Sequence, residues 1–163
     1  MKGSILKRNI SLTPLVIVFA AIVITSMAAT AQNGNSCSLA RAAGKYGFND
    51  SGTVVGIGPR VATGIFTLDA AGNLLNGKAT SSLNGQIANE AFSGPYTINS
   101  DCTGTFALQV SDPSSGKLLF TATLNLAWDD NMRELRFIFT SVALPDGTPL
   151  TPVINGDARK MVP

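Results

Sequence analysis

Short segments in which apolar and polar residues alternate follow one another from residue 44 to the end of the chain. Between Lys117 and Trp128, for example, every second residue is apolar, as in a strand that buries one face. Turn sequences such as Asn84-Gly85 and Asp146-Gly147 separate the segments. We therefore expect about eight antiparallel strands, at residues 45–50, 61–69, 73–82, 86–98, 103–111, 117–128, 134–143 and 152–161.

One strand pattern recurs. Residues 44–49, 64–69 and 94–99 all read Gly-x-(Tyr/Phe)-x-(Phe/Leu/Ile)-(Asn/Asp). The pattern indicates a strand with two large apolar residues on one face, after which the Asn or Asp begins a turn. Glycines that follow each unit are expected to supply the positive φ of the turn, and these are Gly52, Gly72 and Gly104.

Eight consecutive strands that each have one apolar face must close on themselves or stack as two sheets. Closure removes the exposed edges, and the length suits an eight-stranded barrel. We expect an all-β fold, an antiparallel up-and-down barrel, with a two-sheet sandwich as the alternative. An outer-membrane barrel is a third possibility, but paired aromatic girdles are missing from the sequence. A short helix is expected over residues 38–43, capped by Ser38 and ended by Gly44.

The N-terminal segment has the organisation of a secretory signal. A basic start precedes an unbroken apolar run at residues 15–24, and Ala29-Thr30-Ala31 offers a cleavage site before Gln32. The run is shorter than the roughly 20 residues that span a bilayer, although an uncleaved anchor is the alternative. We predict a signal peptide at 1–31, an N-terminal segment at 32–43 and a barrel domain at 44–163, secreted or periplasmic.

Charge and composition exclude several functional classes. Loss of residues 1–31 removes three of the twelve Lys and Arg residues and no acidic residue. The remaining chain then has nine basic and ten acidic residues, a formal net charge of −1. No basic cluster is left to bind nucleic acid, and no membrane association is expected after cleavage. The chain has no histidine, which excludes Ser-His and Cys-His catalysis and histidine-ligated zinc. No cofactor and no metal site are predicted.

The two cysteines, Cys37 and Cys102, both follow the predicted cleavage site. An even count in an exported chain indicates a disulfide. The alternative is a reactive thiol pair, but the short C-x-x-C spacing and a neighbouring cluster of positive charge are both absent from the sequence. We predict a structural bond between them.

The glycine and turn motifs of residues 64–77 and 94–104 resemble those of a loosely defined group of small exported bacterial proteins. That resemblance implies a calycin-like or allene-oxide-cyclase-like barrel and carries over no catalytic residue. A short helix before a Gly-x-aromatic strand is also similar to lipocalins, although Tyr46 stands where a lipocalin has tryptophan.

Glu90 is the most informative single position for function. In a regular strand it shares a face with Phe92, Tyr96 and Ile98, so it would be an acid or base, or bind the polar end of a ligand, inside an apolar barrel. Alternatively, the Glu90 side chain points into solvent at a β-bulge or at the rim of the barrel. Tyr96 is a second weak catalytic candidate. The predicted ligand-binding residues are Tyr46, Phe66, Leu68, Glu90, Phe92, Tyr96, Phe106, Leu124, Trp128, Phe137 and Phe139.

Three functions are compatible with this pattern. The first is a non-catalytic barrel that binds a small apolar molecule or another surface, since apolar walls with a few polar groups suit such a cavity. The second is a structural or adhesive module whose barrel is filled by its own side chains. The third is an isomerase or cyclase of the allene-oxide-cyclase or dirigent type, with Glu90 and a tyrosine giving acid–base help. The alternative to ligand contact for Tyr46, Tyr96 and Trp128 is packing within the barrel.

Overall fold

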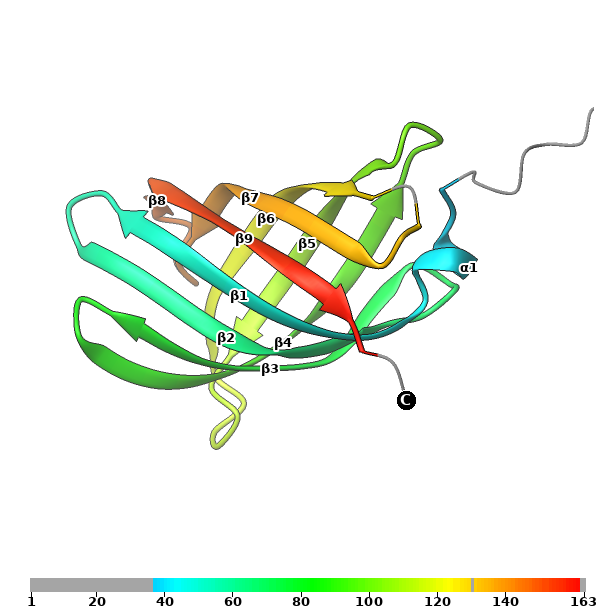
Figure 1. Cartoon of the computed structure of the whole chain (residues 1–163). Helices are drawn as coiled ribbons and strands as arrows, with labels where there is room; N and C mark the ends of the chain where they lie inside the picture. Colours follow the sequence, from blue (N-terminus) through cyan, green and yellow to red (C-terminus); the bar gives the residue numbers. More distant parts are fainter. Residues whose placement is uncertain (1–36, 130, 162–163) are drawn as a thin grey trace, which may run out of the picture. The chain divides into compact units, whose positions relative to one another are not determined.

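The computed structural model describes residues 37–129 and 131–161. Within them the chain forms one short helix followed by nine strands (Figure 1). The elements are α1 (Leu39–Ala42), β1 (Gly44–Val54), β2 (Gly58–Leu68), β3 (Asn73–Leu83), β4 (Gln86–Ile98), β5 (Thr103–Ser111), β6 (Leu118–Trp128), β7 (Glu134–Ala143), β8 (Pro149–Leu150) and β9 (Pro152–Lys160).

The strands close into a single antiparallel barrel. Each of β1 to β7 pairs with its neighbours in sequence, and β9 closes the ring by pairing with both β7 and β1. The two-residue strand β8 is an addition beside β7. The expected eight-stranded up-and-down barrel is therefore confirmed, and the sandwich alternative is wrong. Because no edge of the ring is left unpaired, the fold avoids the hazard of an exposed edge strand.

Most strand bounds follow the alternation closely, but the first two strands are longer than expected, and β2 begins at Gly58 instead of Val61. The predicted strands 86–98, 103–111 and 134–143 coincide with β4, β5 and β7. Asn49, however, does not begin a turn, because β1 continues to Val54. Gly52 lies inside this longer strand, where a Cβ would collide with the backbone of Val153 on β9, so this glycine permits a close approach of two strands.

The other two units of the recurring pattern do end in turns. Asp69 accepts hydrogen bonds from the backbone N–H groups of Ala71 and Asn73, and Gly72 takes a φ of 89°. In the third unit the positive φ belongs to Cys102, at 67°, while Gly104 already lies in β5. The expected role of Gly104 in the turn is therefore wrong.

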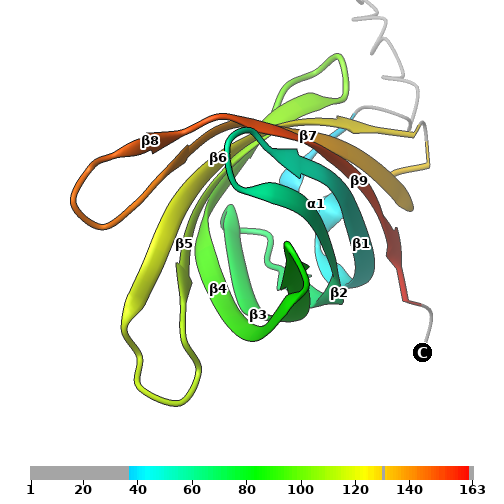
Figure 2. The same cartoon turned by 90° about the vertical axis from the view of Figure 1, so that its left-hand side faces the viewer.

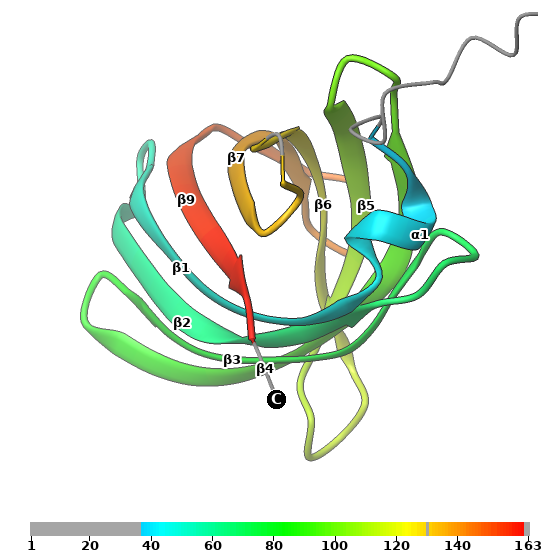
Figure 3. The same ribbon diagram turned by 45° about the vertical axis from the view of Figure 1, so that its right-hand side comes forward.

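Helix α1 lies at one end of the barrel, which we call the α1 end (Figure 3). Ser38 caps the helix by accepting a hydrogen bond from the Arg41 N–H, and the helix stops before Gly44, where β1 begins. The predicted disulfide is confirmed: Cys37 bonds to Cys102 in the β4–β5 turn, with the two Cα atoms 5.1 Å apart. A buried disulfide fits an oxidising environment.

The predicted signal peptide and its cleavage site lie outside the described residues. Within 37–129 and 131–161, no helix has the length and apolar character needed to cross a membrane.

Candidate functional site

The half of the barrel opposite α1 contains the buried charged side chains of the described residues. We call this the distal end; it is formed by the β1–β2 and β3–β4 turns at residues 55–57 and 84–85, and Figure 2 looks onto it. Three charged side chains point inward here: Asp50 from β1, Arg60 from β2 and Glu90 from β4. All three are buried.

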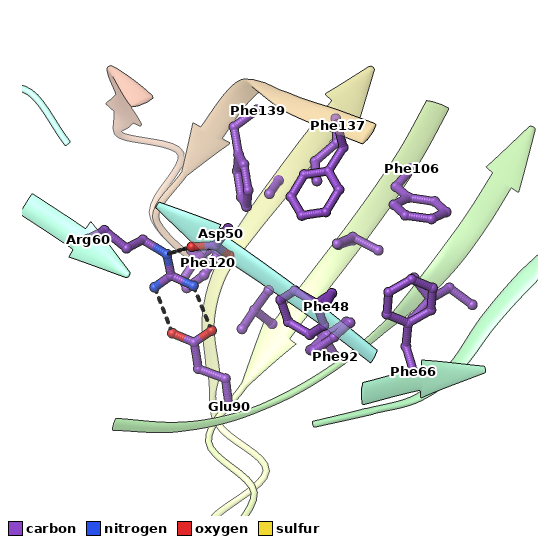
Figure 4. A pocket seen from close by; sticks show the side chains of 15 residues that line it. Phe48, Asp50, Arg60, Phe66, Glu90, Phe92, Phe106, Phe120, Phe137 and Phe139 are labelled. Carbon is purple, nitrogen blue, oxygen red and sulfur yellow. Dashed lines mark hydrogen bonds and ion pairs between the residues drawn. The ribbon is translucent and has the colours of Figure 1, made fainter. Parts of the chain in front are cut away.

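Arg60 and Glu90 form a two-pronged ion pair (Figure 4). Arg60 Nη1 donates to Glu90 Oε1 at 2.9 Å, and Nη2 donates to Oε2 at 3.0 Å. Ser81 Oγ on β3 donates to the same Oε1 at 2.7 Å. This fork geometry is the strong form of an arginine–carboxylate contact, so Glu90 is held tightly and its oxygens are engaged. An acid–base role would require Glu90 to exchange these partners.

Asp50 is bound less completely. Its Oδ1 lies 3.6 Å from Arg60 Nε, beyond hydrogen-bond length, and this buried oxygen accepts no hydrogen bond. Burial raises the pKa of Asp50 to about 6, against the lowering effect of Arg60 and with a further increase from the negative charge of Glu90. Burial lowers the pKa of Arg60. The hydrogen bonds and negative charge of Glu90, together with the negative charge of Asp50, have the larger effect and raise that pKa above its ordinary value.

Phenylalanine rings form the walls beside this cluster. The rings of Phe48, Phe66 and Phe92 contact one another with centroids 5.7–6.3 Å apart, and Phe120 lies under Arg60 with the guanidinium carbon 5.7 Å from its ring centre. The free space among these side chains is about 40 Å³, enough for a few water molecules. The full lining is Phe48, Asp50, Arg60, Phe66, Leu74, Glu90, Phe92, Phe106, Leu108, Val110, Phe120, Ala122, Leu124, Phe137 and Phe139.

The structure divides the predicted ligand-binding residues between the two ends. Those that line the cavity are Phe66, Glu90, Phe92, Phe106, Leu124, Phe137 and Phe139. The remaining four, which are buried but absent from its lining, are Tyr46, Leu68, Tyr96 and Trp128.

The two tyrosines instead connect α1 and the turns to the barrel. Tyr46 Oη donates to the backbone oxygens of Ala42 and Met132, and Tyr96 Oη donates to the backbone oxygen of Asp69. Burial raises the pKa of each tyrosine to about 12, so both hydroxyls keep their protons and act as donors at neutral pH. Their position gives the rings and hydroxyls a packing role.

Asp50 and Arg60 are site residues that sequence reasoning missed. Asp50 follows Tyr46 and Phe48 at alternate positions of β1, and Arg60 precedes Ala62 at the next inward position of β2. Asp50 is the last residue of the predicted strand 45–50, so the alternation that placed Glu90 inside also applies to it, whereas Arg60 was missed because the predicted second strand begins at Val61.

Comparison with known proteins adds information on the fold alone. No protein-family model matches the chain, and no curated protein matches it. Among solved structures it is similar to "EF1p2_mFAP2b bound to DFHBI", with a TM-score of 0.52, 12% identity, and coverage of 76% of this chain and all of that one. It is less similar to the redesigned β-barrel mFAP1, also bound to DFHBI, with a TM-score of 0.45 and 14% identity over 76% of this chain and 98% of that one. At such low identity the likeness shows a shared barrel fold.

Proposed function

We propose that this protein is an exported, non-catalytic barrel that binds a small, largely apolar molecule in the distal half of its interior. The observation that carries the proposal is the buried cluster of Asp50, Arg60 and Glu90 beside phenylalanine walls. Apolar walls with a few convergent polar groups are the usual composition of a ligand site. A purely structural barrel gains little from buried ions, since desolvation offsets their attraction.

Three half-buried rings, Phe48, Phe92 and Phe120, decide how a ligand would fit. A free space of about 40 Å³ is well below the roughly 300 Å³ or more of a typical ligand pocket. Binding therefore requires these rings to move, as side chains at binding sites commonly do. The related fold of EF1p2_mFAP2b, whose structure is described as bound to DFHBI, supports the idea that a barrel of this kind can hold an organic molecule.

Export is part of the proposal. The basic start, apolar run and small-residue cleavage motif of residues 1–31 support it, and so does the Cys37–Cys102 bond, which suits a secreted or periplasmic protein. On the glycine motifs we also propose kinship with the small exported barrel proteins that the sequence resembles.

The small free volume favours a second candidate, the structural module with a filled barrel. Here Phe48, Phe92 and Phe120 would stay in place as core, and the ion cluster would only fix the register of β1, β2 and β4. This candidate predicts no bound molecule at all, which makes the two functions separable by one experiment.

The test measures the binding of N-phenylnaphthylamine, a neutral apolar dye that brightens in apolar sites, to protein expressed from the full-length chain and isolated from the exported fraction. A ligand-binding barrel gives saturable fluorescence, and Phe92→Trp, which enlarges a side chain of the cavity, weakens the affinity at least about tenfold. Ile87→Trp on the exposed face of the same strand is the matched control and leaves binding unchanged.

The opposing outcome is equally definite. Absence of saturable fluorescence, together with a native mass that carries no extra molecule, would overturn ligand binding in favour of the filled barrel. Equal loss in the Phe92 and Ile87 variants would place the dye outside the cavity.

A further inference from the structure

Asp50 offers the cavity an acceptor that receives no hydrogen bond from the residues that the structure describes. Its side chain is 2% exposed, and its Oδ1 accepts no hydrogen bond. A buried carboxylate oxygen without a donor is costly, and native structures seldom leave one unpaired without a reason. A ligand that brings a donor to this atom would remove that cost on binding.

The charges around Asp50 select the kind of donor. Both terminal nitrogens of Arg60 are engaged by Glu90, so one guanidinium faces two carboxylates within the cluster. An anionic ligand group would meet an excess of negative charge and find the arginine fork already occupied. A cationic group would balance the second carboxylate, Asp50.

The walls of the cavity suit the same kind of group. The faces of phenylalanine rings attract cations, and Arg60 already lies over the ring of Phe120. An ammonium group is close to water in size, so the free space of about 40 Å³ accepts it without displacement of side chains. The apolar body of such a ligand would push the half-buried rings of Phe48 and Phe92 aside and occupy the space that they leave.

We infer that the cavity binds an apolar or aromatic primary amine, whose ammonium group donates a hydrogen bond to Asp50 Oδ1 while its body lies among the phenyl rings. The inference rests on the proposed function, since it names the chemical class of that ligand. It assigns Asp50 as the residue that determines specificity, and Arg60 and Glu90 as the pair that positions it.

Acidity should modulate this selectivity. Among the residues that line the cavity, on all the strands that contribute to it, the ionisable ones are Asp50, Arg60 and Glu90. Because the pKa of Asp50 lies at about 6, this carboxyl is mostly charged above that pH and mostly neutral below it. The preference for an amine over a neutral ligand of the same shape therefore weakens as the pH falls through about 6.

The test compares three compounds of nearly equal shape as competitors of N-phenylnaphthylamine: naphthylmethylamine, ethylnaphthalene and naphthoic acid. At about pH 7.5, where Asp50 is charged, the amine should bind at least about tenfold more tightly than ethylnaphthalene. Naphthoic acid should bind most weakly. Asp50→Asn should abolish the preference for the amine while ethylnaphthalene binds as before. Asp157→Asn, which removes the same charge from the outer face of β9, should leave the preference intact.

Two results would separate the possible failures. Equal binding of the amine and ethylnaphthalene, or tightest binding of naphthoic acid, would overturn the inference while the proposed function stands. If the dye itself shows no saturable binding, the proposed function fails first. Because the comparison of compounds uses the unmodified protein, it decides the question even if Asp50→Asn does not fold.

Discussion

The two ends of the barrel are built in different ways. At the α1 end Tyr46, Met132 and Leu135 are fully buried, the tyrosine hydroxyl bonds two backbone oxygens, and a disulfide fixes the segment before the helix. At the distal end the rings of Phe48 and Phe120 are half-buried, and three charged side chains are buried beside them.

Among the side chains of the described residues, two buried polar atoms lack a hydrogen bond of standard geometry: Trp128 Nε1 at the α1 end and Asp50 Oδ1 at the distal end. The first is a neutral indole N–H, which costs about 1–3 kcal/mol when unpaired. The second belongs to a carboxyl group, whose charged form is far more costly to bury. The α1 end therefore stabilises the fold, whereas the distal end keeps a polar group at a cost in stability.

Reduction of the Cys37–Cys102 bond is expected to have the largest effect on stability. The bond joins residues 65 apart, and opening a loop of that length should lower the free energy of unfolding by about 4 kcal/mol. Denaturant titration of oxidised and reduced protein measures this difference. Under native conditions the reduced protein should still bind N-phenylnaphthylamine with unchanged affinity. Loss of binding on reduction would contradict the separation of the two ends.

Asp50→Asn is expected to stabilise the protein, and only at higher pH. The pKa of Asp50 is raised to about 6 in the folded state, so its ionisation opposes folding. The stability that neutral Asp50 contributes is complete below its unfolded pKa of about 3.9 and is lost as the pH rises through 6. Two pKa units correspond to about 3 kcal/mol of unfolding free energy. The wild type loses this amount when Asp50 ionises, and the asparagine variant should keep it at about pH 7.5.

Denaturant titrations of wild type and variant at a series of pH values check this expectation. The two curves should coincide below about pH 4, diverge as the pH rises from 4 to 6, and stay apart by a constant amount above pH 6, where Asp50 is charged. Asp157→Asn on the outer face is the control and should run parallel to wild type. A constant difference at every pH would mean that the asparagine acts through packing instead of charge.

The sequence predicted the barrel well because one face of each strand carries large apolar residues. Alternation of this kind fixes register and face together, which is why the bounds of β4, β5 and β7 are correct to the residue. The disulfide followed from the even number of cysteines in a chain with a predicted export signal. Neither inference needed a contact between residues distant in the chain.

The site was harder to predict because its chemistry depends on pairing between strands. Asn49 was interpreted as the start of a turn, since Asn and Asp favour turns, but pairing with both β2 and β9 keeps β1 extended beyond it. Arg60 was left outside the second strand because that strand was predicted to begin at Val61, whereas β2 begins at Gly58. Glu90 was placed inside correctly, yet its partner Arg60 is 30 residues away, and a single sequence contains no signal that joins them.

Tyr46→Phe tests the hydrogen bonds of the α1 end with little change in packing. The ring stacks on Phe66 at 5.3 Å and should stay there, while the bonds to the Ala42 and Met132 oxygens are lost. The free energy of unfolding should fall by about 1–2 kcal/mol, as measured by denaturant titration. Thr63→Val, which removes an exposed hydroxyl bonded to the backbone, is the control and should change it by less than about 0.5 kcal/mol.

The smallest expected effect comes from an ion pair on the outer face, which contrasts with the buried cluster. Glu134 lies 3.6 Å from Arg136 and 3.4 Å from Arg159, whose side chains are 80% and 75% exposed. Solvent and salt screen such pairs, so Glu134→Gln should cost less than about 1 kcal/mol and nothing measurable in about 1 M salt. Thermal unfolding of both proteins at low and high salt checks this. A cost as large as that of disulfide reduction would mean that surface charge carries stability assigned above to the α1 end.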